Sequence, residues 1–401
     1  MLLFFCAIFL FSLLYHVQAD KKFSILCYNI PMKREIVIIG GGIVGSTAAF
    51  YLSQEKDCQV TLIDEGTGTA TRAAAGIICP WLSQRRNQDW YHLTASGAAF
   101  YPQLMSDLQE VGFSNPAYKQ TGTLVFKNKE KLLKKLENIA LERREKAPMI
   151  GELNLFTGQS VTQIIPQLST EQGAILASGG GRVDGNLLLD HLQEAFLQNG
   201  GRLLHGKAEL IDEQTISINQ QVLKTDQIIL AVGVWLPQLL APLDYTVDVR
   251  PQKGQLLEIE TDFTTDEWSG CMLHGEIDIL PFENGKLVIG ASHEDNMGFD
   301  LTLDDDKIEK MKETASQFIP ELAELPISAR RVGIRAYTSD YSPFYGNLSD
   351  QEHIWVASGL GSSGLTSGPF IGWQIAQEIL DKNPHFDRSP YSPSKYIKKI
   401  D

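Results

Sequence analysis

The strongest constraint on this chain is a glycine-rich turn between two short apolar stretches. Residues 35–39 are typical of a buried strand, residues 46–54 of a helix and residues 59–63 of a second strand. The first strand and the helix are joined by Gly40-Gly41-Gly42-Ile43-Val44-Gly45. A strand, a G-x-G-x-x-G turn and a helix in this order predict a βαβ unit that binds a dinucleotide.

Each glycine of the turn has a separate role. Gly40 allows the tight turn, Gly42 lets the backbone approach a pyrophosphate, and Gly45 lets the helix pack closely on the strand. The N-terminus of the helix then presents free N–H groups and a partial positive charge, which attract phosphate.

The second strand ends in Asp64-Glu65, about twenty positions after the turn, where an acidic side chain can bind a ribose hydroxyl. The whole frame of strand, turn, helix, strand and acid is present. It therefore favours a dinucleotide site over the alternative, a glycine-rich turn without a ligand.

Length and charge limit the remaining classes. A chain of 401 residues can bury a large core and is expected to form two closely associated domains. Its net charge of −14 argues against nucleic acid as a partner, since such a surface needs a positive field.

The N-terminus and the cysteines bear on location. The five cysteines (Cys6, Cys27, Cys58, Cys79 and Cys271) include no CxxC pair and no zinc-like spacing, so we expect reduced thiols and no metal. Residues 1–31 are interpreted as a leader or a mis-assigned start, and a cytoplasmic location is favoured. The alternative is export, with residues 1–19 as a signal peptide that ends in Val17-Gln18-Ala19.

Apolar periodicity outlines the rest of the chain. Helices are expected at 89–111, 130–146, 186–198 and 304–318, and a last helix is expected to begin at Pro369, because proline favours the first helical position. In the helix at 130–146, Leu132, Leu136 and Ile139 are expected to form the buried face. Residues 227–233 resemble a central parallel strand, and residues 247–299 have antiparallel texture.

Six further segments follow the turn in a recognisable order. They are Thr71-Arg72-Ala73-Ala74-Ala75-Gly76, Gly181-Arg182-Val183-Asp184, Ile229-Leu230-Ala231-Val232-Gly233-Val234-Trp235, Arg250-Pro251-Gln252-Lys253-Gly254-Gln255, Gly333-Ile334-Arg335-Ala336-Tyr337-Thr338-Ser339-Asp340 and Gly359-Leu360-Gly361-Ser362-Ser363-Gly364-Leu365-Thr366. With these segments the chain resembles the flavin-dependent amine and amino-acid oxidoreductases, the group of glycine oxidase, D-amino acid oxidase and dehydrogenase, and sarcosine oxidase. The resemblance runs from about residue 33 to residue 380.

The resemblance implies an α/β fold, α+β overall, with a Rossmann-like FAD-binding domain and an interleaved antiparallel-sheet substrate domain. The FAD-binding domain would be discontinuous, with residues 32–85, 160–240 and 330–401. The substrate domain would comprise residues 86–159 and 241–329.

The resemblance also implies the cofactor site, with FAD held non-covalently because no cysteine lies in residues 335–346 or in the closing loop. The implied cofactor contacts are Gly40, Gly42, Ile43, Val44, Gly45, Asp64, Glu65, Arg72, Ala73, Ala74, Ala75, Gly76, Ala208, Gly233, Trp235, Gly361, Ser362, Ser363, Gly364, Leu365 and Thr366.

Arg335 is the expected substrate anchor, because a guanidinium binds a carboxylate through two parallel hydrogen bonds. Asp278, Tyr337 and His274 are weaker candidates. Asp278 stands where relatives often place a tyrosine; it could hold a substrate ammonium, but we interpret it as a turn residue. Ser362 stands where some relatives carry a second arginine.

The implied reaction oxidises the C–N bond of a small amino acid or amine, D-amino acid or glycine/sarcosine-like, by hydride transfer to flavin N5, with O2 or a quinone as the electron acceptor. On the same scaffold the alternatives are oxidation of a 2-hydroxy acid or of an N-methyl amino acid. A nicotinamide dehydrogenase is disfavoured by the antiparallel region, and a non-catalytic flavin-binding protein would need no carboxylate anchor. A homo-oligomer is compatible with all of these.

Overall fold

The structure, a computed structural model, describes residues 33–275, 277–349, 351–382 and 385–400. The interpretation of residues 1–31 as a leader or mis-assigned start therefore lies outside the described residues. Within the described part of the chain, none of the helices is long and apolar enough to cross a membrane.

The first of two large sheets is built around the βαβ unit predicted from the glycine-rich turn. Five of its six strands run parallel, and β20 joins one edge antiparallel. The order of strands is β20 (Phe344–Leu348), β21 (Gln351–Ser358), β13 (Gln227–Leu230), β1 (Arg34–Ile39), β2 (Cys58–Asp64) and β9 (Arg202–His205).

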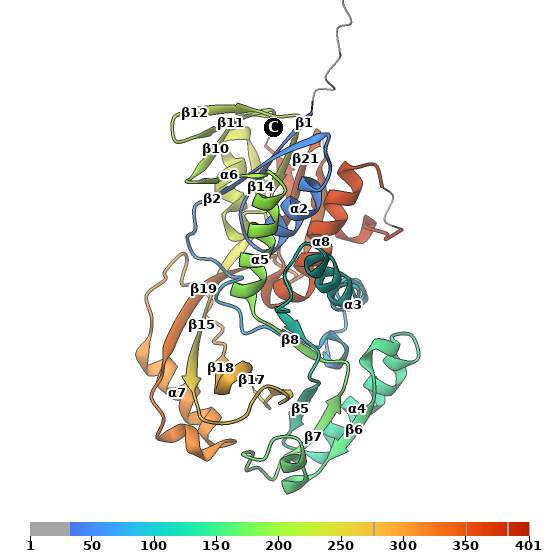
Figure 1. The fold of residues 1–401 in the computed structure, drawn as a ribbon, viewed down its shortest axis with the longest axis vertical. Coiled ribbons are helices and arrows are strands. Elements are labelled where there is room, and N and C mark those ends of the chain that lie inside the picture. The colour runs from blue at the N-terminus through green and yellow to red at the C-terminus, as the bar shows by residue number, and fades with distance from the viewer. Residues whose placement is uncertain (1–32, 276, 350, 383–384, 401) are drawn as a thin grey trace, which may run out of the picture. The chain divides into compact units, whose positions relative to one another are not determined.

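Both faces of this sheet are covered, which explains why its central strands are apolar throughout. Ile36 and Ile38 of β1 pack among helices, whereas Val37 and Ile39 point to the opposite side. Figure 1 shows the helices α2, α5 and α8 beside the sheet and the strands β10 to β12 above it. The covering elements are α2 (Ile43–Ser53), α3 (Gln88–Glu110), α5 (Gly185–Gln198) and α8 (Gly364–Ile379) on one face, and α6 (Leu236–Leu240), β10 (Ala208–Asp212), β11 (Thr215–Ile218) and β12 (Gln221–Lys224) on the other.

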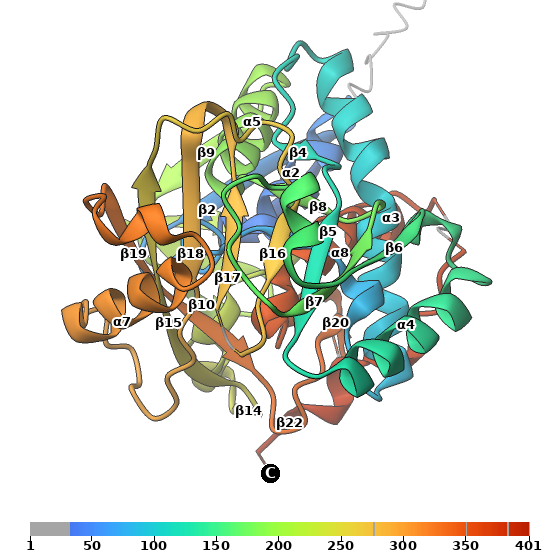
Figure 2. The same cartoon turned by 90° about the horizontal axis from the view of Figure 1, so that it is seen from below.

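The second large sheet has eight strands and is mixed, because β16 and β5 run parallel while the other neighbours are antiparallel. Its order is β19 (Ala329–Tyr337), β15 (Arg250–Glu260), β18 (Lys286–Gly290), β17 (Asp278–Pro281), β16 (Gly270–Met272), β5 (Thr123–Lys127), β7 (Gly173–Ala177) and β6 (Leu153–Phe156). Helix α7 (Asp305–Ser316) packs on β15 and β18, and α4 (Glu130–Arg144) packs on β5 to β7 (Figure 2). A parallel sheet and a mixed sheet confirm the expected fold class.

Besides the small sheet of β10, β11 and β12, the remaining strands form two more small sheets. One has the order β3 (Ile77–Ile78), β8 (Gly181–Val183) and β4 (Tyr118–Lys119), and the other pairs β14 (Tyr245–Val247) with β22 (Ile397–Lys399).

The last long helix begins earlier than predicted. Helix α8 starts at Gly364, so Pro369 lies inside it rather than at its first position. A proline there leaves the carbonyl of Leu365 without its N–H partner one turn later. The hydroxyl of Tyr101 donates to that carbonyl at 2.6 Å and replaces the missing bond.

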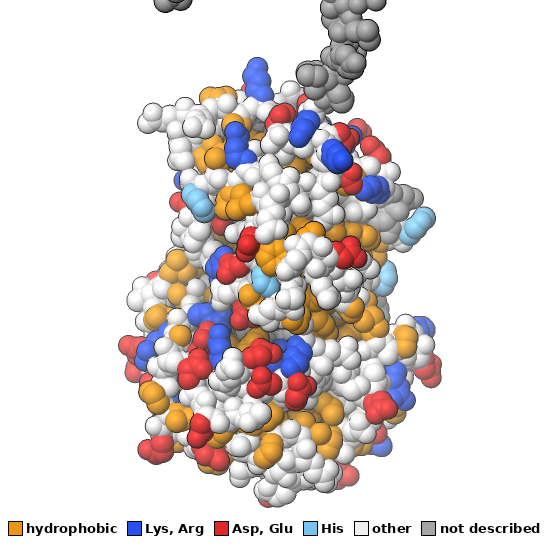
Figure 3. Space-filling view, in the orientation of Figure 1, with side chains coloured by type: hydrophobic (Ala, Val, Ile, Leu, Met, Phe, Trp, Pro, Cys, Tyr) orange, Lys and Arg blue, Asp and Glu red, His pale blue; other side chains and the backbone are white. Residues whose placement is uncertain are grey.

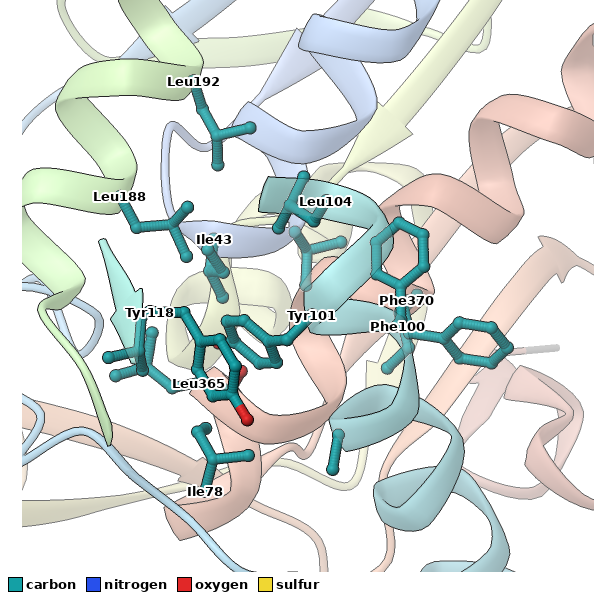
Figure 4. Packing of buried hydrophobic residues seen from close by; sticks show 14 of the residues in the cluster. Ile43, Ile78, Phe100, Tyr101, Leu104, Tyr118, Leu188, Leu192, Leu365 and Phe370 are labelled. Carbon is teal, nitrogen blue, oxygen red and sulfur yellow. The ribbon is translucent and has the colours of Figure 1, made fainter. Parts of the chain in front are cut away.

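This replacement lies within the main apolar core. Figure 4 shows Tyr101 and Tyr118 side by side near Leu365, with their ring centroids 4.6 Å apart. Tyr101 comes from α3 and is fully buried, so its hydroxyl has little access to water. A contact within the core therefore stabilises a helix that begins before Pro369, although a proline inside a helix is locally unfavourable.

The buried face of α4 was also predicted imperfectly. Leu136 is buried as expected, but Leu133 and Ala140 are its buried companions, and Leu132 and Ile139 are partly exposed. The face that packs on β5 and β7 is therefore rotated by about one position from the predicted one.

Two strands lie in ranges that we expected in the FAD-binding domain but belong to the eight-stranded sheet. They are β7, within 160–240, and β19, which lies within 330–401 except for its first residue, Ala329. The two-domain division stays a proposal, and we now assign these two strands to its substrate domain.

Candidate functional site

A cavity with a volume of about 550 Å³ lies at the carboxyl ends of β1, β2, β13 and β21. In an open parallel sheet this edge is where ligands bind. Of the predicted cofactor residues, the lining includes Gly40, Gly42, Ile43, Val44, Asp64, Glu65, Ala208, Gly233, Trp235, Gly361 and Gly364.

The glycine turn has the geometry that a pyrophosphate cradle requires. Gly40 has a φ of +106°, and a Cβ there would lie 2.3 Å from the carbonyl oxygen of Ala231. A Cβ at Gly45 would lie 2.0 Å from the carbonyl oxygen of Gly40, so this residue serves helix packing and does not line the cavity. A Cβ at Gly42 meets only Thr71, at 3.6 Å, so the backbone there is open to a ligand.

The N-terminus of α2 faces the cavity and is not capped by its own side chain. Its N-cap is Gly42, and its first two residues, Ile43 and Val44, line the cavity. The hydroxyl of Thr71 accepts the N–H of Ile43 at 3.2 Å, which fixes the following loop against the helix start. N–H groups and a partial positive charge at this end suit the phosphates of a dinucleotide.

The opposite end of the cavity contains residues that sequence reasoning missed. Besides Asp64, Glu65 and Ala208, it is lined by the neighbours of Ala208 and by part of α6 and the turn that follows: Gly206, Lys207, Glu209, Leu210, Gln238, Leu239 and Pro242. No motif marks these residues. Their only signal was their position next to Ala208 and after the Gly233–Trp235 segment.

The loop after β2 contributes its first half to the cavity. Thr67, Thr69, Ala70 and Thr71 line it, whereas the predicted contacts Arg72, Ala73, Ala74, Ala75 and Gly76 do not. Arg72 turns away and forms an ion pair with Asp190 at 2.8 Å.

The closing loop before α8 is divided in the same way. Gly359, Leu360, Gly361 and Gly364 line the cavity, whereas the predicted contacts Ser362, Ser363, Leu365 and Thr366 do not. The Ser363 hydroxyl donates to the carbonyl of Leu360 at 2.7 Å. This bond stiffens the turn into α8.

Strand β19 has its two faces in different surroundings. Ile334 and Ala336 line the cavity beside Trp235. Arg335 and Tyr337 lie on the opposite face, because successive side chains of a strand alternate. A Cβ at Gly333, on the same face as Arg335, would lie 2.7 Å from the Cβ of Ala73.

Tyr337 connects this face to the closing loop. Its ring lies against Gly361, where a Cβ would come within 2.1 Å of the ring. Its hydroxyl oxygen accepts the N–H of Ser362 at 3.0 Å. Arg335 thus lies between Gly333, over the Ala73 loop, and Tyr337, over the closing loop.

The guanidinium of Arg335 reaches β15 and the residues that follow β18. It donates to the carbonyl oxygen of Ser292 at 2.8 Å and to the side-chain oxygen of Gln252 at 3.3 Å. It also lies flat over Gly254, the residue paired with Gly333 across β15 and β19. A larger residue than glycine at position 254 would displace it.

Asp278 is a strand residue, so its interpretation as a turn residue is wrong. It pairs with Gly290 in β17 and β18, and Gly290 pairs with Leu256, which places Asp278 on the same face of the sheet as Leu256 and Arg335. Residues of the described chain offer its carboxyl no hydrogen bond or ion pair. Burial raises the pKa of this carboxyl to about 7.

His274 is exposed and lies in the connection between β16 and β17. No group of three or more His, Cys, Asp or Glu in the described residues could hold a metal ion. On the face drawn in Figure 3, Lys and Arg are interspersed with Asp and Glu and form no basic patch.

The chain is similar in sequence to a family of oxidoreductases and to several of its members. The family model of FAD-dependent oxidoreductases, DAO, matches residues 35–378. An uncharacterized oxidoreductase of Bacillus subtilis, YurR, is 35% identical over 368 residues, which cover 90% of this chain and 99% of the relative. Glycine oxidase of Pseudomonas putida is 26% identical over 374 residues, with 90% and 99% covered.

Among solved structures, iminodiacetate oxidase from Chelativorans sp. BNC1 is similar with a TM-score of 0.86 and 30% identity. The alignment covers 89% of this chain and 98% of that chain. The similarity therefore extends over both large sheets.

Proposed function

Because the chain belongs to the DAO family of FAD-dependent oxidoreductases, we propose that it oxidises the C–N bond of a small amino acid or amine that carries a carboxylate next to the reacting carbon. The family makes the chain a FAD-dependent oxidoreductase of the amino acid oxidase type. Glycine-like, sarcosine-like and D-amino acid substrates are all within the proposal.

The position of Arg335 carries this proposal. Its guanidinium contacts the Ser292 carbonyl and the Gln252 side chain, and it lies between the Ala73 loop and the closing loop. A guanidinium can bind an incoming carboxylate through two parallel, charge-assisted hydrogen bonds. In this proposal Arg335 binds the carboxylate of the substrate.

FAD fits the cavity through this chain's own groups. Gly42 and the start of α2 would hold the pyrophosphate, and Asp64 with Glu65 would hold the ribose at the far end. When bound, FAD supplies the acceptor for the substrate's hydride. None of the described lining residues is Cys, His or Tyr, which supports non-covalent binding.

The protein's share of the reaction is orientation and proton handling. Arg335 fixes the carboxylate, and Tyr337 holds the closing loop in place through Ser362. Asp278, with a pKa of about 7, can accept the proton that a substrate ammonium must lose before its C–N bond is oxidised. This acid favours an amine over the 2-hydroxy acid alternative, which has no ammonium to hold.

The location and electron acceptor are also proposals. The described cysteines Cys58, Cys79 and Cys271 are free thiols, which supports a cytoplasmic location. O2 and a quinone are both acceptors that the proposal allows. Comparing reoxidation of the reduced protein in air and with a soluble quinone would choose between them.

The test is to purify the yellow protein and ask which compounds bleach it without air. Glycine, sarcosine, proline, iminodiacetate, D-amino acids and 2-hydroxy acids form the panel. Acid precipitation should release FAD into the supernatant if it is bound non-covalently. A protein that binds no flavin, or one that no amine reduces, would overturn the proposal.

Arg335→Ala tests the anchor. Loss of a two-pronged, charge-assisted contact should lower kcat/KM by about 100-fold or more while FAD stays bound. Arg330→Ala, on the same strand but exposed, is the matched control and should keep normal turnover. Unchanged kinetics in Arg335→Ala would remove Arg335 from the site.

A further inference from the structure

Gln252 is a buried neighbour of the proposed substrate anchor. It belongs to β15, and the register of the sheet places it directly opposite Arg335 of β19. Residues paired in this way point to the same face of a sheet, so both side chains lie on one face. Gln252 is only 6% exposed, and its amide must therefore find its hydrogen-bond partners within the protein.

The two ends of the Gln252 amide have different partners. Its oxygen accepts an N–H of Arg335 at 3.3 Å, and its nitrogen donates to the carboxylate of Asp295 at 3.0 Å. A guanidinium only donates hydrogen bonds, whereas a carboxylate only accepts them. Since only one orientation of the amide satisfies both neighbours, Asp295 determines which end of Gln252 faces Arg335.

The backbone places Asp295 beside Gln252. The residue before it, Glu294, exchanges two backbone hydrogen bonds of 3.0 Å with Lys253, the residue after Gln252. The carboxylate of Glu294 is buried and accepts the hydroxyl of Ser292 at 2.6 Å. These contacts fix the segment along β15 and leave Asp295 little freedom to move away from the amide.

The same segment also contacts Arg335 directly. The carbonyl oxygen of Ser292 lies 2.8 Å from Nη1, the same guanidinium nitrogen that donates to Gln252. Nη1 carries two N–H groups, one for each of these oxygens. Together they fix the plane of the guanidinium where it lies over Gly254.

The kind of group that contacts Arg335 also matters. The oxygen of Gln252 carries no net charge, so this hydrogen bond directs the guanidinium without adding an anion beside it. The anion, Asp295, contacts the other end of the amide. A carboxylate in the place of the amide would attract the guanidinium more strongly and would compete with a substrate carboxylate.

We propose that Gln252 is a positioning residue for Arg335 and that Asp295 acts through it, so that together they set the plane in which the guanidinium meets the substrate carboxylate. This inference rests on the proposed function, in which Arg335 binds that carboxylate. It makes the affinity for the substrate depend on the order of three groups: guanidinium, amide and carboxylate.

The test measures how methoxyacetate, a carboxylate without an amine, binds the FAD-loaded protein, through the change in flavin absorbance. Gln252→Leu removes both hydrogen bonds of the amide, and its Kd should rise by about tenfold. Asp295→Asn lets the amide turn its N–H groups toward Arg335, and its Kd should rise by about three- to tenfold. With an amine substrate, KM should rise by the same factors while kcat stays within about threefold.

Two combined variants distinguish positioning from a merely structural role. In the Gln252→Leu background, Asp295→Asn should change Kd by less than about twofold, because the residue through which Asp295 acts is gone. Gln252→Glu together with Asp295→Asn keeps one amide and one carboxylate but exchanges their places. This exchange should weaken binding at least as much as Gln252→Leu, although the net charge is that of the wild type.

Glu260→Gln is the matched control, because it removes an exposed carboxylate from the same strand. It should bind methoxyacetate as the wild type does, and Arg335→Ala should lose the binding that the other variants weaken. Flavin content reports folding in each variant. Asp295 is half-exposed, so Asp295→Asn keeps the test decisive even if Gln252→Leu does not fold.

Three results would overturn the proposal. One is a wild-type Kd in both Gln252→Leu and Asp295→Asn. Another is an effect of Asp295→Asn that persists in full in the Gln252→Leu background. The third is methoxyacetate binding that is absent in the wild type or unchanged in Arg335→Ala, which would also remove the anchor.

Failure of the proposed function would look different. If methoxyacetate binds with the expected pattern but no amine reduces the flavin, the reaction is wrong and the positioning role of Gln252 stands. If amines reduce the flavin while the Gln252 and Asp295 variants keep the wild-type Kd and KM, the reaction stands and the positioning role is refuted.

Discussion

At the residue scale, Asp278 gives the clearest dependence on pH. Its carboxyl has a pKa of about 7 in the folded protein because burial disfavours the charged form, whereas an exposed aspartate titrates near 4. Between these values the folded state holds a proton that the unfolded state has lost. Folding stability therefore falls as pH rises from about 4 to about 7, and the loss is complete above the folded pKa.

Asp278→Asn should remove this loss. We expect the variant and the wild type to unfold at similar temperatures at pH 4, and the variant to be more stable by about 4 kcal/mol at pH 8. Thermal unfolding at several pH values measures the difference. A gap that stays constant from pH 4 to pH 8 would show that Asp278 does not titrate in this range.

The sequence identified some site residues better than others. The geometry of the turn glycines could be predicted because a motif assigns each of them one role, whereas the role of Arg335 stays a proposal. Asp278 was misread as a turn residue because the apolar run that marks β17 begins only at Ile279.

At the element scale, α8 shows how a tertiary contact overrides a local rule. Proline at a first helical turn is a sound expectation, but α8 begins five residues before Pro369. The hydroxyl of Tyr101, 264 residues away, donates to the carbonyl that Pro369 leaves without a partner. A partner at that distance in the sequence cannot be predicted from the helix itself.

Removing this hydroxyl should destabilise the protein through that carbonyl. Tyr101→Phe leaves a buried acceptor without a donor, which costs about 1–3 kcal/mol. With Pro369→Ala the helix can supply its own N–H, so Tyr101→Phe should cost much less in that background. Chemical denaturation of the four proteins of this double-mutant cycle measures the coupling.

Tyr345→Phe is a suitable control, because the Tyr345 hydroxyl is buried and has no hydrogen-bond partner in the described structure. Its removal should be neutral or stabilising. If Tyr101→Phe costs the same with and without Pro369, the hydroxyl does not compensate for the proline.

At the scale of the whole molecule, the sequence predicted which kinds of sheet form but not every strand's membership. The turn at residues 40–45 and the apolar strand at 227–230 specify the parallel sheet almost alone. Strands β7 and β19 were placed with it by their neighbours in sequence, yet they pair with β5 and β15. Strand partners depend on which edges meet in space, and periodicity within one strand does not contain that information.

Arg182 connects segments that lie far apart in the sequence. It lies in β8 and is 1% exposed, and its guanidinium reaches the Glu283 carboxylate at 2.7 Å, the Asp266 carbonyl at 2.9 Å and the Pro281 carbonyl. Strand β8 pairs with β3, which continues the loop after the glycine-rich unit, while Pro281 ends β17 of the eight-stranded sheet. One buried side chain thus joins the segment after the glycine-rich unit to the eight-stranded sheet.

Arg182→Met should loosen both sheets together. Removing the cation leaves buried carbonyl oxygens without a donor, so we expect a loss of about 3–5 kcal/mol in the free energy of unfolding. Because Arg182 contacts both regions, flavin release and loss of secondary structure should shift to lower temperature by the same amount.

Arg202→Met, at an exposed position, should leave both transitions unchanged. Flavin fluorescence and circular dichroism in one thermal scan measure the two transitions. Flavin release at a lower temperature than the loss of structure, in the Arg182 variant alone, would mean that Arg182 supports only the cofactor loop and that the sheets unfold independently of it.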